Sequence, residues 1–254
     1  MKILLLKFRN IGDVLLSTPL VNNLRHHYPN AQIDFCVNKE TEAMLTLNPN
    51  LNKIITYDRI AIKSLTSIKR LWRELQFIRS FKKENYDVVI NLTSGDRGNL
   101  IAWISNATKR IGYSNKSWFF RKSLTHELPK QELRHTVDAN LDPLRLLNIP
   151  ISNKSVEIFW NSKDEQAISS ELTNINNFIH LHPVSRWLFK CISDNTMAQI
   201  IDYCQLNMGL KVVITASEDK FELEKVNKIL SLTKSKPINL SGRLSLKETA
   251  ALNK

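Results

Sequence analysis

The fold class follows from the stretch MKILLLKFRNIGDVLLSTPL, residues 1–20. The apolar run Ile3–Leu6 gives way to polar Lys7–Asn10, and after Gly12 and Asp13 apolar residues return at the spacing of a helix. This order predicts a strand, a tight turn and a helix that begins at an acid. In open α/β sheets, ligands bind outside the carboxyl ends of the strands, and Asp13 is expected at such an end.

Asp13 has two interpretations at this position. A helix N-terminus that binds phosphate normally lacks a negatively charged side chain, so that its amides can hold the anion. Asp13 is therefore predicted to act as a base or as a hydrogen-bond acceptor for a neutral group. The alternative is that it only caps the helix.

The composition is typical of a soluble globular protein, with 43% hydrophobic and 24% charged residues. No apolar run reaches the roughly 20 residues that span a bilayer, and the N-terminal apolar run, interrupted by Lys7, is too short for a signal peptide. The three cysteines, Cys36, Cys191 and Cys204, are widely spaced and form no CxxC motif. They suit a reducing cytosol and argue against a structural zinc site.

The net charge of +12 is unevenly distributed. Between Arg59 and Arg134 there are 16 Lys or Arg against 6 Asp or Glu, and this basic block predicts an anionic partner. Nucleic acid, an anionic membrane and a phosphorylated ligand all fit. The alternative is a solvated helical face, because residues 68–83 place apolar side chains at helical spacing between charges: Leu71, Trp72, Leu75 and Ile78.

Strands and helices are expected to alternate along the whole chain. The predicted strands are Lys2–Leu6, Gln32–Val37, Lys53–Tyr57, Asp87–Leu92, Arg110–Tyr113, Phe178–His182, Lys211–Ala216 and Ile238–Leu240. This alternation predicts an α/β fold with parallel sheets covered by helices on both faces. The turn-rich segment Ile149–Asn161 predicts a boundary that separates one domain, residues 1–158, from a second, residues 159–254.

The chain ends close to the start of an expected helix. Ser245 and Glu248 form a capping-box pair that opens this helix, and the sequence stops at Lys254. Only three strands are predicted in the second domain, which would leave part of its sheet uncovered. We therefore expect the second domain to be incomplete and the sequence to be truncated.

A second candidate functional loop lies in FIHLHPVSRWLFKCISDN, residues 178–195. An apolar strand leads into Ser185, Arg186 and Lys190, and a helix is expected to open near Ser193. A hydroxyl, two cations and a helix N-terminus in one loop predict an anion-binding site. A P-loop is excluded because its glycines are absent, and the missing G-x-G-x-x-G argues against a dinucleotide fold. The alternative is a basic surface turn.

Three weaker candidates follow other strands. Glu218 and Asp219 could bind ribose hydroxyls, or could be first-turn acids favoured by the helix dipole. Arg97 lies on the ligand-binding edge of the first sheet and is our candidate for acceptor binding, unless it only pairs with Asp96. His26 and His27 are expected on an exposed helix face, and no Ser-His-Asp, Cys-His or His-x-x-His constellation can be assembled.

Several of these loops together resemble a known family. The opening KILLLKFRNIGDVLLSTPLVNNLRHHYPNAQIDFCV resembles the start of the bacterial lipopolysaccharide heptosyltransferases, glycosyltransferase family 9. HLHPVSRWLFKCISDN is similar to the donor loop of that family, and LSGRLSLKETAALNK is similar to the segment that leads to its last nucleotide motif. NLTSGDRGNLIAWISNATKRIGY is most similar to the third core heptosyltransferases.

The resemblance implies a GT-B architecture of two Rossmann-like domains, the second of them incomplete here. The first domain would receive the lipid-linked acceptor, and the second would hold ADP-heptose. In such an enzyme Asp13 matches the catalytic base, and the donor contacts fall on four residues: Ser185 and Lys190 at the diphosphate, Glu218 near the ribose and Leu244 against the adenine. The family's Asp-Thr-x-x-x-His segment would follow residue 254, so residues 1–254 are expected to bind ADP-heptose weakly and to turn over slowly or not at all.

An inverting heptose transfer of this kind needs no metal or cofactor, because Lys190, Ser185 and the helix amides suit the leaving diphosphate. The implied partners are ADP-heptose, the inner core of lipopolysaccharide and the anionic cytoplasmic face of the inner membrane, where the enzyme would be peripheral. Two other classes compete. A nucleotide-binding module or inactive fragment would lack catalysis, and a basic nucleic-acid-binding protein would show a helix-turn-helix, RRM or OB signature that is absent from this sequence.

Overall fold

The computed structural model describes residues 1–114, 123–129, 134–173, 175 and 177–254. Two compact units make up the chain, Met1–Phe159 and Trp160–Lys254. Part of the predicted basic block, residues 115–122 and 130–133, lies outside the described residues.

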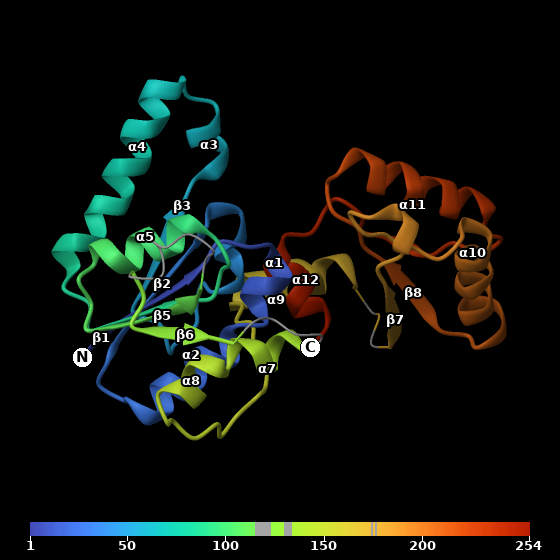
Figure 1. Ribbon diagram of the computed structural model, residues 1–254. Coiled ribbons are helices and arrows are strands. Elements are labelled where there is room, and N and C mark those ends of the chain that lie inside the picture. Colours follow the sequence, from blue (N-terminus) through green and yellow to red (C-terminus); the bar gives the residue numbers. More distant parts are fainter. Residues whose placement is uncertain (115–122, 130–133, 174, 176) are drawn as a thin grey trace. The chain divides into compact units, whose positions relative to one another are not determined.

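The first unit is built on a six-stranded parallel sheet in the order β3–β2–β1–β4–β5–β6 (Figure 1). Its strands are β1 (Lys2–Lys7), β2 (Gln32–Asn38), β3 (Lys53–Tyr57), β4 (Val88–Asn91), β5 (Lys109–Tyr113) and β6 (His126–Leu128). This is the strand order of a Rossmann fold, in which the chain reverses direction across the sheet between the first and fourth strands.

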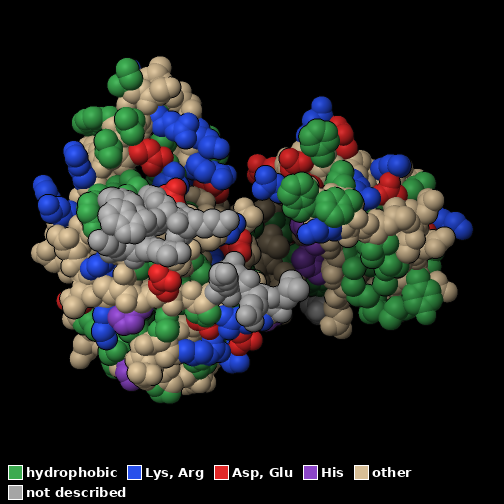
Figure 2. Space-filling model, in the orientation of Figure 1, with side chains coloured by type: hydrophobic (Ala, Val, Ile, Leu, Met, Phe, Trp, Pro, Cys, Tyr) green, Lys and Arg blue, Asp and Glu red, His purple; other side chains and the backbone are tan. Residues whose placement is uncertain are grey.

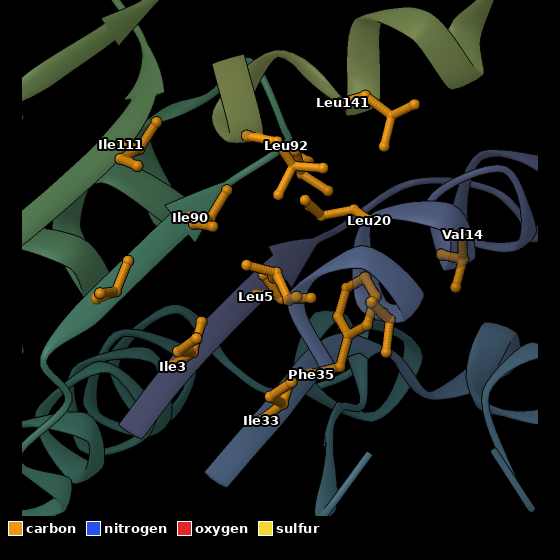
Figure 3. Packing of buried hydrophobic residues seen from close by; sticks show 14 of the residues in the cluster. Ile3, Leu5, Val14, Leu20, Ile33, Phe35, Ile90, Leu92, Ile111 and Leu141 are labelled. Carbon is orange, nitrogen blue, oxygen red and sulfur yellow. The ribbon is translucent and has the colours of Figure 1, made fainter. Parts of the chain in front are cut away.

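Both faces of this sheet are buried, which explains the unbroken apolar run at the N-terminus. Successive side chains of a strand point to opposite faces, so Ile3 and Leu5 belong to one core cluster while Leu4 and Leu6 belong to another. The first cluster includes residues of α1 (Ile11–Leu15), α2 (Thr18–His27), α7 (Thr136–Asn140) and α8 (Asp142–Leu146) (Figure 3). The second includes residues of α4 (Ser67–Ser80), η2 (Phe81–Glu84) and α5 (Asp96–Ile104). Two further short helices, η1 (Lys39–Met44) and α3 (Arg59–Lys63), flank β3 in the chain.

The prediction of a single helix at Asp13 is wrong. The structure has two helices, α1 and α2, with a break at Leu16 and Ser17. The break is caused by Pro19, which has no N–H to continue the hydrogen-bond ladder of α1. The carbonyl of Leu15 instead accepts a hydrogen bond from the Thr18 hydroxyl at 2.9 Å. Apolar periodicity runs through both helices, so it could not reveal the break.

All eight predicted strands are present, and no end differs from the prediction by more than two residues. The sequence analysis missed β6, a three-residue strand of sequence HEL in which only Leu128 is apolar. The expected helix over residues 68–83 is also present as α4 and η2. Of its four apolar residues named above, however, only Ile78 is buried, while Leu71, Trp72 and Leu75 are exposed.

The second unit has a three-stranded parallel sheet among its described residues, in the order β7–β8–β9. The strands are β7 (Phe178–Leu181), β8 (Lys211–Ile214) and β9 (Ile238–Asn239). One core cluster joins β7 and β8 to α10 (Asp194–Asp202) and α11 (Lys220–Leu232) (Figure 1). The other joins all three strands to α9 (Ser162–Glu171) and α12 (Leu246–Leu252). A π-helical turn, η4 (Tyr203–Asn207), follows α10, and the predicted Ser245–Glu248 capping box opens α12.

Within the described part of the chain, no helix is both long enough and apolar enough to cross a membrane.

Candidate active site

The carboxyl ends of β1 and β4 meet at the point where the strand order of the first sheet reverses. The loops after these strands are tied together, because the Phe8 amide donates to the Thr93 hydroxyl at 2.9 Å and the Arg9 guanidinium to the Ser94 hydroxyl at 3.1 Å. Asp13 lies half-buried on α1 at this edge, where ligands bind in open α/β sheets.

Asp13 forms part of a capping box, as the structural interpretation predicted. Its carboxylate accepts a hydrogen bond from the Asn10 amide at 3.4 Å, near the limit of hydrogen-bond geometry. Asn161 and Asp164 form the same box at the start of α9, with a shorter bond of 2.9 Å. Helix capping therefore explains why Asp13 occupies this position. Capping needs only a hydrogen-bond acceptor, whereas a role as a base needs a carboxylate.

The surface beside Asp13 is open. Gly12 is exposed, and no described atom lies within 4 Å of the position that a Cβ would take there. Its φ is not in the left-handed region, so the turn does not require a glycine for conformational reasons. A substrate can approach the start of α1 from this side.

Lys7, the last residue of β1, was missed as a site residue. Its ammonium is buried and donates to the Leu92 carbonyl at 3.1 Å and to Asn140 Oδ1 at 3.0 Å. The amide of Asn140 in turn donates to the Leu16 carbonyl at 2.9 Å, which fixes the end of α1. Burial lowers the pKa of Lys7 to about 8, and the negative charge of Asp13 opposes this shift.

Arg97 is held by a contact that the sequence did not suggest. Its guanidinium donates to Glu74 on α4 at 2.9 Å and to the Tyr57 hydroxyl at 2.8 Å, and it lies 4.0 Å from the centre of the Tyr57 ring. Burial and the hydrogen bond to Glu74 raise the pKa of Tyr57 to about 12, so this phenol stays protonated. The cation thus joins β3, α4 and α5, and its role in acceptor binding stays a prediction.

Replacing Arg97 with methionine is expected to lower the free energy of unfolding by about 1.5–3 kcal/mol, the range for hydrogen bonds to charged groups. Urea denaturation measures this, and a double-mutant cycle with Glu74→Gln tests whether the loss comes from the pair. Unchanged stability together with a loss of acceptor affinity would instead assign Arg97 to the acceptor.

In the second unit, the predicted anion loop follows β7. The Ser185 hydroxyl accepts from the Trp187 amide at 3.2 Å and donates to the Trp187 carbonyl at 3.0 Å, which folds the loop back on itself. Lys190 ends a short helical turn, η3 (Leu188–Lys190), and its exposed ammonium lies 5.9 Å from the centre of the Phe189 ring. The structure therefore places the two residues predicted to bind the diphosphate, Ser185 and Lys190, on the same loop.

A cavity of about 510 Å³ lies between this loop and the start of α11. Its lining consists of Ser185, Arg186, Leu188, Ser217, Asp219, Phe221 and Glu222. Glu222 was missed by the sequence analysis: it is buried and accepts from the Ser217 hydroxyl at 2.6 Å and amide at 3.1 Å. Its position in a helix, three residues after Asp219, gave no sign that it would point into the site.

The other predicted donor residues lie around this cavity or elsewhere in the second unit. Glu218 is exposed between β8 and α11, while its neighbour Asp219 caps α11 and accepts from the Phe221 amide at 2.9 Å. Leu244 is half-buried and packs against the core cluster of β8 and α12. The helix expected near Ser193 is present as α10. The Ser193 hydroxyl caps it by accepting a hydrogen bond from the Thr196 amide at 3.2 Å.

Comparisons with known proteins agree with this architecture. Residues 74–254 match the model of glycosyltransferase family 9 (heptosyltransferase). Lipopolysaccharide heptosyltransferase 3 of Escherichia coli is 28% identical over 248 residues, which are 95% of this chain and 72% of that protein.

Two solved structures have the same fold. The glycosyl transferase family 9 protein of Veillonella parvula matches with a TM-score of 0.85 and 24% identity, over 98% of this chain and 71% of that one. The E. coli heptosyltransferase WaaC, solved with ADP-2-deoxy-2-fluoro heptose, matches with a TM-score of 0.74 and 15% identity, over 99% and 79%.

The chain belongs to glycosyltransferase family 9, the heptosyltransferases. It has the α/β, GT-B type of fold that these structures share, and it is a transferase.

Proposed function

We propose that this enzyme transfers heptose from ADP-heptose to the inner core of lipopolysaccharide with inversion at the anomeric carbon. The observation that carries the proposal is the position of Asp13 at the reversal point of the first sheet, in a chain of the heptosyltransferase family. We infer that the first unit receives the acceptor and that the second unit holds the donor.

In the proposed reaction, Asp13 acts as the general base. An acceptor hydroxyl gives its proton to the Asp13 carboxylate while its oxygen attacks the anomeric carbon of the heptose. The bond from that carbon to ADP breaks, and its electron pair goes to the diphosphate oxygen. A single displacement inverts the anomeric configuration, and a positioned base typically contributes about 10²–10⁴-fold to the rate.

Lys7 has a supporting role in this scheme. Its buried ammonium donates to the Leu92 carbonyl and to Asn140 Oδ1, and the charge of Asp13 opposes the fall in the Lys7 pKa that burial causes. Because Asn140 also holds the end of α1, the same contacts fix the helix that carries Asp13.

The donor site is proposed for the loop after β7. Ser185 and Lys190 would bind the diphosphate and stabilise the charge that develops on it as ADP leaves. Glu218 would bind the ribose, and the exposed part of Leu244 would pack on the adenine. The cavity beside Ser185, with Glu222 in its wall, offers room for part of this nucleotide.

The acceptor is a phosphorylated lipid in this proposal, which suits the basic side chains of the first unit. Figure 2 shows Lys and Arg side chains gathered over the region of α3 and α4. We infer a peripheral position on the cytoplasmic face of the inner membrane, where such an acceptor would be met.

Donor selectivity tests the proposal. Titration calorimetry is expected to show that ADP-heptose and ADP bind, whereas the corresponding uridine compounds do not bind measurably. Tighter binding of UDP or a UDP-sugar than of the adenine compounds would contradict the assigned donor.

A further inference from the structure

The outer face of α4 carries a continuous row of apolar side chains. Ile68, Leu71, Trp72 and Leu75 are 84%, 62%, 61% and 40% exposed. Their spacing of three and four residues places them on one face of the helix, one above the other. Figure 2 shows hydrophobic side chains gathered over α4.

The outward face of α4 is apolar, although Ile78 of the same helix is buried in the core. The charged Glu74 points inward and pairs with Arg97, while the aromatic Trp72 points outward. Scattered apolar residues are normal on a protein surface, whereas a contiguous patch of this kind marks an interaction site. Ile60 on the neighbouring α3, 70% exposed, lies outside this row and adds to the apolar surface of the region.

Basic side chains border the row. Arg79 follows Leu75 by four residues and so continues the same face, and the exposed side chains of Lys69, Lys82 and Lys83 lie on α4 and η2. A cavity of about 460 Å³ brings the two chemistries together, with Trp72 and Leu75 beside Arg79 and Lys83 in its lining.

The acid at this cavity is already neutralised. Glu84 pairs with Lys2 at 2.5 Å and lies 3.8 Å from Lys53, and Lys2 holds its pKa below the usual range. The cavity therefore presents an apolar wall and two cations to a ligand. An acyl chain with a phosphate headgroup has the matching chemistry.

Charge decides between a bilayer and a second copy of the chain. A symmetric contact would bring the same basic border of both copies together, in a protein that carries a net charge of +12. Anionic headgroups would instead neutralise these cations, and apolar side chains with Trp, Lys and Arg are what interfacial helices present to a membrane.

We propose that the row Ile68, Leu71, Trp72 and Leu75 enters the headgroup region of an anionic bilayer, with Arg79 and Lys83 on lipid phosphates. This inference rests on the proposed function, because it takes the acceptor to be a lipid. It assigns the membrane contact to one helix of the first unit.

Vesicle flotation tests this with phosphatidylcholine alone and with added phosphatidylglycerol. The unsubstituted chain is expected to float with the anionic vesicles and to be released by salt. Leu71→Gln with Trp72→Gln should weaken this binding by about tenfold or more, since each side chain loses the gain from burial. Arg79→Gln with Lys83→Gln should remove the preference for anionic lipid.

The matched control is Tyr203→Gln with Leu206→Gln, an equally exposed aromatic and leucine pair in the second unit, which should bind as the unsubstituted chain does. Equal flotation of the α4 variant, or no flotation of the unsubstituted chain, would overturn the inference. A dimer that only the α4 variant abolishes would also overturn it and assign the row to self-association. These vesicles contain no heptose acceptor, so flotation does not depend on the transfer reaction. Heptose transfer is measured separately with a water-soluble acceptor. Failure of that transfer would overturn the proposed function and leave the membrane contact standing.

Discussion

Replacement of Asp13 with asparagine is expected to lower turnover by about 100-fold or more while the affinity for ADP-heptose is kept. Asparagine has the same shape and can still accept the hydrogen bond from the Asn10 amide, but it cannot take a proton from the acceptor. Steady-state transfer rates and calorimetry with ADP-heptose measure the two quantities separately.

The second capping box of the chain supplies a matched control for this substitution. Asp164 occupies the same position in α9 that Asp13 occupies in α1, with an asparagine cap in each case. Asp164→Asn should therefore change stability as Asp13→Asn does and leave turnover unchanged. Equal turnover in both variants would reduce Asp13 to a capping residue.

Lys190→Ala is expected to weaken ADP binding by about 1.5–3 kcal/mol, which corresponds to roughly 10- to 150-fold in affinity. The ammonium is exposed on the loop after β7 and would bind the diphosphate directly. Calorimetry with ADP measures the loss, and Lys236→Ala, an exposed lysine elsewhere in the second unit, should leave the affinity unchanged.

Arg186 provides the contrast for this experiment. It lines the cavity beside Ser185, whereas Lys190 is not among the lining residues. If Arg186→Ala weakens ADP binding and Lys190→Ala does not, the diphosphate lies in the cavity and the assignment of Lys190 is wrong.

The fold could be predicted to a large extent because its signals are local. Alternating apolar runs gave every strand except β6, whose three residues lack an apolar pattern. The break between α1 and α2 was missed because the apolar spacing continues across it. Pro19, near the start of α2, was the available signal, since proline is favoured in the first turn of a helix.

The candidate site could be predicted only where single loops define it. Asp13, Ser185 and Lys190 each lie in the segment that connects a strand to the next long helix, so the strand pattern located them. The partners of Lys7 lie 85 and 133 residues away in the sequence, and those of Arg97 lie 23 and 40 residues away. A single sequence, read by itself, carries no record of such contacts.

The stereochemistry of transfer shows whether Asp13 assists a single displacement at the anomeric carbon. In a single-turnover reaction of the chain with ADP-heptose and a lipopolysaccharide core acceptor, the proton spectrum of the product gives the configuration of the new linkage. We expect one added heptose with the anomeric configuration opposite to that of the donor. A product that retains the configuration of the donor would contradict it, because a single displacement assisted by Asp13 cannot give that result.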